Sequence, residues 1–215
     1  MILARTQHRL LPMVATAMAS MVAAVIAATP ARADQEAANR AYVTTDPWGT
    51  CYARSAPADD YGTAGRTDIY AVGTIDQPDM PVASHGFFAS QLYLSCRVIG
   101  EDGVPAVAMA GLGPWPRGSK PDGDTLAIAF FHGGREVARY STLDISAGKP
   151  DAASCSVSHY QVIGDIEGYQ RNDDDREIFV LTTVDGRRLS FDAATGALLE
   201  TIAGQAPAGG LGGCF

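Results

Sequence analysis

A short segment, Gly111–Gly118, carries the side chains best suited to binding a partner. It has the sequence GLGPWPRG, so Trp115 and Arg117 stand in a stretch that Pro114 and Pro116 make rigid. Binding residues concentrate in loops, and tryptophan and arginine dominate interface hot spots. We therefore predict Trp115 and Arg117 as binding residues. The alternative is that Trp115 folds back to cap the end of a β-sandwich.

Three histidines, His85, His132 and His159, could supply a general base or a metal site. No two of them show ligand spacing such as H-x-H or H-E-x-x-H. His159 follows Ser158 in a strand-like run, where neighbours point to opposite faces, so these two cannot act as a local pair. A small hydrolase with a site assembled from dispersed His, Asp and Ser residues is the alternative function that these residues leave open.

An acidic run, Asn172–Glu177, is the segment that most resembles a cation site. Calcium loops place carboxylates at alternate positions and use a glycine for the sharp turn, and this run has neither feature. We interpret it as a solvated loop, and we predict neither a metal site nor a cofactor.

Four cysteines, Cys51, Cys96, Cys155 and Cys214, follow the first 33 residues. An even count in an exported chain indicates two disulfides, and four cysteines allow three pairings. We favour Cys51 with Cys96, which joins the N-terminal segment to a strand, and Cys155 with Cys214, which pins a Gly-rich tail. A free thiol or an interchain disulfide is the alternative for Cys214.

The segment around Cys51, GTCYARS, resembles the nucleophile segment of papain-like cysteine proteases, which implies a catalytic Cys51. That family has its histidine about 130–150 residues downstream, and residues 181–201 contain none. Such a nucleophile opens a long helix, whereas Pro57, Gly62 and Gly65 follow here. We therefore expect Cys51 to be a disulfide cysteine.

The first 33 residues predict an export signal. Basic residues precede an apolar run, Leu10–Thr29, and Ala31-Arg32-Ala33 forms an A-x-A cleavage site. The run is close to the roughly 20 residues that span a bilayer, so a retained anchor is the alternative. After cleavage the mature chain begins at Asp34 and has no stable membrane span. We expect it in the periplasm or outside the cell.

Cleavage also makes the chain more acidic. The removed segment holds three of the 16 basic residues and none of the 24 acidic ones, which leaves 13 against 24 and a formal net charge of −11. Such a surface repels phosphate groups, which argues against nucleic acid and anionic lipid as partners. The expected partner is a protein or a small neutral or cationic ligand.

The elements that position these side chains are predicted to be strands, because Gly and Pro interrupt the chain repeatedly and short β-branched and aromatic runs lie between them. In Gln91–Ile99, alternation places Cys96 on the face of Leu92 and Leu94. The expected strands are Thr67–Val72, Gln91–Ile99, Val104–Ala110, Thr125–Phe131, Glu136–Ser141, Val157–Asp165, Glu177–Thr183, Arg188–Phe191 and Leu198–Ile202. Short helices are indicated only at Asp34–Arg40 and Thr142–Ile145.

Glycine turns link several of these strands. Gly133-Gly134 and Asp185-Gly186 predict tight hairpins, and a further turn at 193–196 makes Glu177–Ile202 a three-stranded meander. Residues 191–199, FDAATGALL, resemble the turn of quinoprotein-type β-propeller repeats, which implies a blade. The motif occurs once, whereas a propeller needs several blades of about 40 residues.

We predict one all-β domain, residues 34–202, and a flexible tail, residues 203–215. Its expected form is a single antiparallel β-sandwich or partly open β-barrel of about eight to ten strands with two disulfides. The mature chain shows no phosphate loop, metal spacing, nucleophile elbow or cofactor motif. We therefore expect an exported binding or interaction protein without catalysis of its own.

Overall fold

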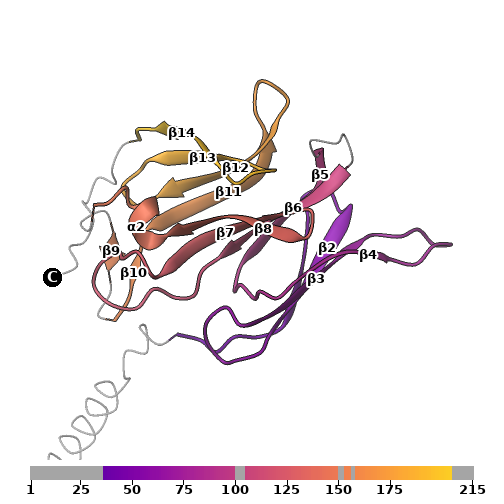
Figure 1. The fold of residues 1–215 in the computed structure, drawn as a ribbon, viewed down its shortest axis with the longest axis horizontal. Helices are drawn as coiled ribbons and strands as arrows, with labels where there is room; N and C mark the ends of the chain where they lie inside the picture. The colour runs from indigo at the N-terminus through magenta and orange to yellow at the C-terminus, as the bar shows by residue number, and fades with distance from the viewer. Residues whose placement is uncertain (1–35, 100–104, 150–152, 156–157, 205–215) are drawn as a thin grey trace, which may run out of the picture. The chain divides into compact units, whose positions relative to one another are not determined.

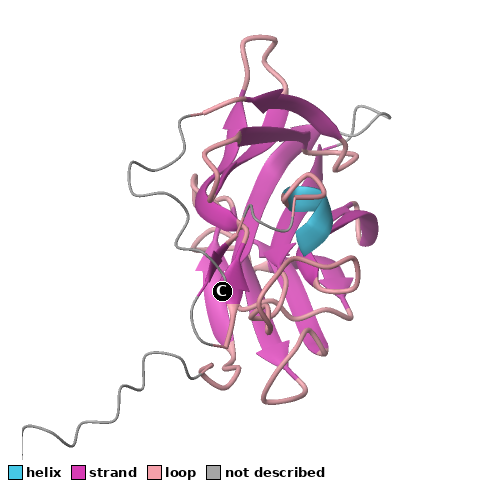
Figure 2. Cartoon of the chain, turned by 90° about the vertical axis from the view of Figure 1, so that its left-hand side faces the viewer, coloured by secondary structure: helices cyan, strands magenta, loops and turns pink. Residues whose placement is uncertain are grey.

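The computed structural model describes residues 36–99, 105–149, 153–155 and 158–204. The chain divides into two units between Gln35 and Glu36, and every described residue belongs to the second. The described residues form strands and one short helix (Figures 1 and 2), which confirms the all-β prediction. Among them, no helix is both long and apolar enough to cross a membrane.

Three four-stranded antiparallel sheets dominate the described residues, and each consists of four consecutive strands. Sheet 1 contains β1 (Tyr42–Thr45), β2 (Cys51–Pro57), β3 (Gly65–Ala71) and β4 (Met80–His85). Sheet 2 contains β5 (Leu92–Ile99), β6 (Pro105–Leu112), β7 (Leu126–His132) and β8 (Arg135–Ser141). Sheet 3 contains β11 (Ile163–Arg171), β12 (Glu177–Thr183), β13 (Arg188–Asp192) and β14 (Leu198–Ile202). The remaining elements are a two-stranded sheet, formed by β9 (Ser154–Cys155) and β10 (Tyr160–Gln161), and the helix α2 (Thr142–Ile145).

This architecture differs from the expected single sandwich or partly open barrel. The described residues form three sheets, and none of the three closes. Each sheet is a meander of consecutive strands, which is also the topology of one propeller blade. The turn that resembles a propeller repeat, residues 191–199, connects β13 to β14 in sheet 3.

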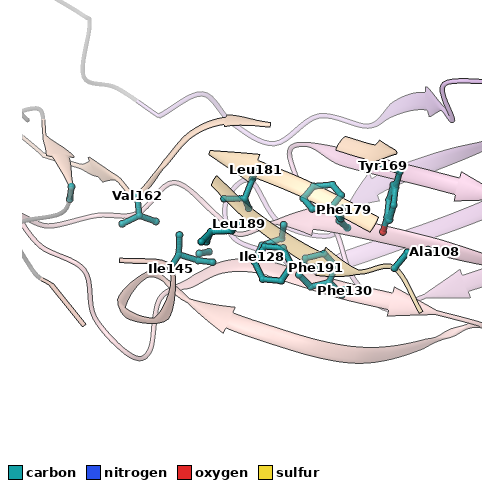
Figure 3. Packing of buried hydrophobic residues seen from close by; sticks show 14 of the residues in the cluster. Ala108, Ile128, Phe130, Ile145, Val162, Tyr169, Phe179, Leu181, Leu189 and Phe191 are labelled. Carbon is teal, nitrogen blue, oxygen red and sulfur yellow. The ribbon is translucent and has the colours of Figure 1, made fainter. Parts of the chain in front are cut away.

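The middle of sheet 2 is buried on both faces, and this arrangement holds the three sheets together. On β7, Ile128 and Phe130 belong to the hydrophobic cluster that sheet 3 shares, whereas Ala129 and Phe131 belong to the cluster that sheet 1 shares. Figure 3 shows Phe130 beside the side chains of sheet 3. Because both faces are covered, β7 has the sequence LAIAFFH, without the polar alternation of a half-exposed strand.

A disulfide joins sheet 1 to sheet 2. Cys51 of β2 and Cys96 of β5 are bonded, with their Cα atoms 6.2 Å apart, as predicted. Cys51 is completely buried, and Cys96 packs against the same cluster as Leu92 and Leu94. The second expected pair is not described, because the side chain of Cys155 and the whole of Cys214 lie outside the described residues.

The expected turns occur where the sequence indicated them. Gly133 and Gly134 have φ of 55° and 84° between β7 and β8, and Gly186 has φ of 85° between β12 and β13. Thr142–Ile145 forms α2, which Ser141 caps through its hydroxyl. The described part of Asp34–Arg40, residues 36–40, is not helical, because its backbone donates instead to the β2–β3 connection, as from Asn39 N to the Asp60 carbonyl.

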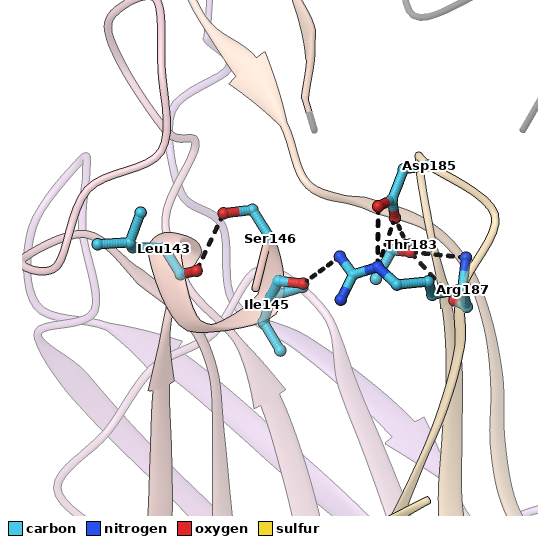
Figure 4. Close-up of polar contacts among 6 residues, drawn as sticks. All are labelled: Leu143, Ile145, Ser146, Thr183, Asp185 and Arg187. Carbon is cyan, nitrogen blue, oxygen red and sulfur yellow. Dashed lines mark hydrogen bonds and ion pairs between the residues drawn. The ribbon is translucent and has the colours of Figure 1, made fainter. Parts of the chain in front are cut away.

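Polar contacts at the β12–β13 hairpin link sheet 3 to α2 (Figure 4). Arg187 Nε lies 2.8 Å from Asp185 Oδ2, and Arg187 Nη2 donates to the Ile145 carbonyl at 2.8 Å. Thr183 also donates its hydroxyl to Asp185. Burial raises the pKa of Asp185, but the bonds from Arg187 and Thr183 outweigh it and hold that pKa below its usual value.

Candidate functional site

A pocket of about 380 Å³ lies where loops and strand ends of all three sheets meet. Segments at 36–39, 62–63, 89–91, 112–116, 126–127 and 161–163 line it, together with Thr142 of α2. These segments include the β2–β3 connection, the approach to β5, the β6–β7 connection and the start of β11. Trp115 is among the lining residues, so one of the two predicted binding residues belongs to this pocket.

Backbone contacts fix the loop that carries Trp115. Gly113 N donates to the Ala127 carbonyl at 2.9 Å, and a Cβ at Gly113 would overlap the Leu126 carbonyl oxygen. On the far side, Tyr160 N donates to the Pro116 carbonyl at 3.1 Å. Because both flanks are bonded, Trp115 is held in place before any ligand arrives.

Trp115 is partly exposed and lies against a histidine. Its ring centroid is 4.1 Å from that of His159, and its side chain is 37% exposed. It therefore does not fold into the core, although its contact with His159 covers part of the indole. A large, rigid aromatic surface remains at the pocket.

Arg117, the second predicted binding residue, is not among the residues that line the pocket. Its Nη2 lies 2.7 Å from Glu36 Oε2, and its guanidinium lies 5.5 Å from the centre of the Tyr61 ring. The hydrogen bond that Arg117 donates to the Glu36 carboxylate raises the pKa of Arg117. Arg117 thus holds the N-terminal segment, in which Glu36 lines the pocket.

A hydrogen-bonded network supports the pocket wall behind Thr142. The Thr142 and Tyr160 hydroxyls are 2.8 Å apart, and Tyr160 is completely buried. Asp122 accepts from Thr125 N at 2.6 Å, from the Thr125 hydroxyl at 3.0 Å and from the Tyr160 hydroxyl at 3.3 Å. Burial raises the pKa of Asp122, but these hydrogen bonds outweigh it and hold the pKa below its usual value.

This pKa shift predicts acid sensitivity. Because the folded-state pKa of Asp122 lies below its unfolded value of about 3.9, its carboxylate stabilises the fold fully above about pH 4 and less as the pH falls through the folded-state pKa. We expect Asp122→Asn to lower the free energy of unfolding at pH 7 by about 1–2 kcal/mol. The difference in unfolding free energy between Asp122→Asn and the wild type should become smaller below about pH 4. Urea unfolding at several pH values measures this difference.

Asp124→Asn is the matched control, because the described contacts of Asp124 involve its backbone N–H rather than its carboxylate. It should change the stability by less than about 0.5 kcal/mol at any pH. If the loss of unfolding free energy in Asp122→Asn stayed constant from pH 7 to pH 3, it would contradict a lowered pKa of Asp122 in the folded state.

The three histidines do not meet at one place. His85 is buried against Phe131, with ring centroids 4.8 Å apart, and burial lowers its pKa. It lines a separate pocket of about 480 Å³ between sheets 1 and 2, and no hydrogen bond of its ring to a described residue is found. His132 ends β7 with a buried Nε2, and His159 lies beside Trp115.

No cation site emerges from the described residues, which contain no cluster of three or more potential metal ligands. Asp173, Asp174 and Asp175 are exposed in the β11–β12 turn, where Asn172 Oδ1 accepts from two backbone N–H groups. Glu177 turns inward instead and accepts from the Ser95 hydroxyl at 2.7 Å. The acidic run is therefore a solvated turn followed by Glu177, whose side chain is almost completely covered.

Comparison of the chain with protein-family models, with curated proteins and with solved structures finds no match. Sequence reasoning found Trp115 but missed Asn39, Gln91, Thr142 and Gln161, which also line the pocket. No sequence signal marks them, because they are neutral residues from separate segments.

Proposed function

We propose that this protein is an exported binding protein, without catalysis of its own, that holds its ligand in the pocket at Trp115. The observation that carries this proposal is the convergence of loops from three sheets on a pocket with one rigid, partly exposed tryptophan. Concave sites with apolar walls and a few polar groups are the usual form of ligand sites. No specific observation favours the hydrolase, which stays a prediction.

Export to the periplasm or the cell exterior is part of the same proposal. The Cys51–Cys96 disulfide is consistent with an oxidising compartment. We further propose the pairing of Cys155 with Cys214, which leaves no thiol in the mature chain. Mass spectrometry of a digest of the exported, non-reduced protein would identify this pair, and a free thiol at Cys214 would contradict it.

The binding proposal is tested by capture from an envelope extract. The exported, oxidised protein is immobilised, and retained macromolecules and small molecules are identified by mass spectrometry. We expect Trp115→Ala to reduce the retained ligand at least tenfold, about 1.4 kcal/mol, while unfolding free energy changes by about 1 kcal/mol or less because the side chain is partly exposed. Arg117→Ala should also weaken capture, since it releases Glu36.

Trp48→Ala is the matched control. Trp48 is exposed to a similar extent, 40%, and contacts Arg97 rather than the pocket. It should retain the same ligand as the wild type. Equal capture by Trp115→Ala and the wild type would exclude the pocket as the binding site.

A further inference from the structure

We propose that the pocket at Trp115 takes an uncharged, hydroxyl-rich ligand, namely a neutral saccharide. This inference rests on the proposed function, because it names the class of ligand for the same pocket. Four observations carry it: the charge of the lining, the hydrogen-bonding groups that remain available, the aromatic surface, and the compact shape of the pocket.

The described lining of the pocket is nearly free of charge. Glu36 is the only charged residue among the described residues that line it, and Arg117 pairs with it at 2.7 Å. A charged ligand would lose hydration without gaining a counter-charge, which is costly. The acidic balance of the whole chain additionally repels anions. The pocket therefore favours a ligand that carries no net charge.

Neutral polar side chains offer hydrogen bonds at the pocket. Ser90, Gln91 and Gln161 line it, and none of the three side chains makes a hydrogen bond to another described residue. Each amide carries donors and an acceptor, and a serine hydroxyl does both. Sugar hydroxyls also donate and accept, so neighbouring hydroxyls on one ring would match these groups. A purely apolar ligand would instead leave them without partners.

Trp115 supplies the apolar part of the contact. The ring face carries negative charge density and attracts the weakly positive C–H groups that a sugar ring presents on one side. Pro114 and Pro116 restrict the loop, so little freedom is lost when a ligand binds. The aliphatic side chains of Leu112, Val162 and Ile163 extend this apolar wall.

The shape of the pocket favours a saccharide over an extended peptide. A peptide in extended form needs a long groove or the free edge of a strand. The residues that line this pocket come from loops and strand ends, and the pocket is compact, at about 380 Å³. It suits a ligand of one or two sugar rings better than a peptide of many residues.

The test uses the exported, oxidised protein on an array of neutral and charged glycans, followed by calorimetry with cellobiose, maltose and N,N′-diacetylchitobiose. We expect binding to neutral glycans, and at least tenfold weaker binding to counterparts that carry a carboxylate, a phosphate or a free amine. Trp115→Ala and the pair Gln91→Ala with Gln161→Ala should each weaken binding at least tenfold. Trp48→Ala should bind like the wild type.

Two results would overturn the inference. One is an array on which no neutral glycan binds, or on which charged glycans bind equally well. The other is Trp115-dependent binding of an uncharged proline-rich decapeptide without saccharide binding. In both cases the saccharide inference fails, but the pocket remains the proposed binding site if capture from the envelope extract still depends on Trp115. If capture does not depend on Trp115, the binding proposal fails as well.

Discussion

Phe130→Ala is expected to lower the free energy of unfolding by about 3–5 kcal/mol. Phe130 is completely buried on β7, beside Phe179 and Phe191 of sheet 3 (Figure 3). Its ring centroid lies 5.0 Å from that of Phe191, 5.5 Å from that of Phe179 and 6.1 Å from that of Tyr140. The substitution leaves a cavity between sheet 2 and sheet 3. It also removes two edge-on aromatic contacts, with Phe179 and Tyr140, and a tilted one with Phe191. Domains of this kind have a net stability of about 5–15 kcal/mol, so the effect is large.

Urea unfolding of the variant and the wild type measures this difference. Ile75→Ala is the control, because Ile75 is fully exposed in the β3–β4 connection and should contribute less than about 0.5 kcal/mol. If Phe130→Ala cost less than about 1 kcal/mol, sheets 2 and 3 could not share the core described for them.

The second large effect is expected from the disulfide between sheets 1 and 2. Cys51 and Cys96 are 45 residues apart, and closing a loop of this length constrains the unfolded chain by about 4 kcal/mol in the chain-entropy model. The double variant Cys51→Ala with Cys96→Ala should lose most of this amount. Burial of Cys51 adds a packing cost when its sulfur is removed.

The single variant Cys51→Ala tests whether the loss belongs to the bond. It breaks the same disulfide, so its urea midpoint should lie close to that of the double variant and well below that of the wild type. A double variant as stable as the wild type would mean that packing alone joins the two sheets.

Sheet 2 and most of sheet 3 could be predicted from the sequence because their buried positions are occupied by large apolar residues. Phe179, Leu181, Leu189 and Phe191 face the core, and glycine turns separate the strands. The predicted meander Glu177–Ile202 corresponds to β12, β13 and β14. The alternation in β5 also placed Cys96 correctly toward the core.

In sheet 1 the expected strand Thr67–Val72 corresponds to β3, whereas β1, β2 and β4 were missed. Polar residues occupy buried positions in this sheet. Ser55 and Thr67 are completely buried, their hydroxyls are 2.9 Å apart, and Thr67 donates to the Phe87 carbonyl. These bonds satisfy groups that would otherwise be costly to bury, but the hydrophobic pattern of a strand is lost. In β4 the apolar residues Met80 and Val82 are exposed, so the strand lacks the usual pattern in which apolar residues are buried and polar ones exposed.

Most of β11 escaped prediction for a different reason. Gly164 and Gly168 interrupt it, and the register shifts twice along its pairing with β12. Such irregularities break the period of two on which a strand prediction depends. The expected strand Val157–Asp165 therefore corresponds to β10 and to the start of β11, with Val162 between them.

Only one residue of the candidate site could be found in advance. Trp115 stood out because prolines flank a large aromatic residue, whereas Gln91 and Gln161 are ordinary neutral residues 70 positions apart. They come together because the start of β11 and the approach to β5 meet the β6–β7 connection at one pocket. Sequence periodicity describes single elements and cannot predict such a meeting of loops.

The most direct test of binding at Trp115 is a ¹H–¹⁵N spectrum of the exported, oxidised protein. The chain contains two tryptophans, so two indole N–H signals are expected, and Trp115→Phe and Trp48→Phe assign them. During titration with the neutral glycan that binds best on the array, the signal of Trp115 should shift and that of Trp48 should stay in place. A shift of the Trp48 signal alone, or of neither signal, would contradict binding at this pocket.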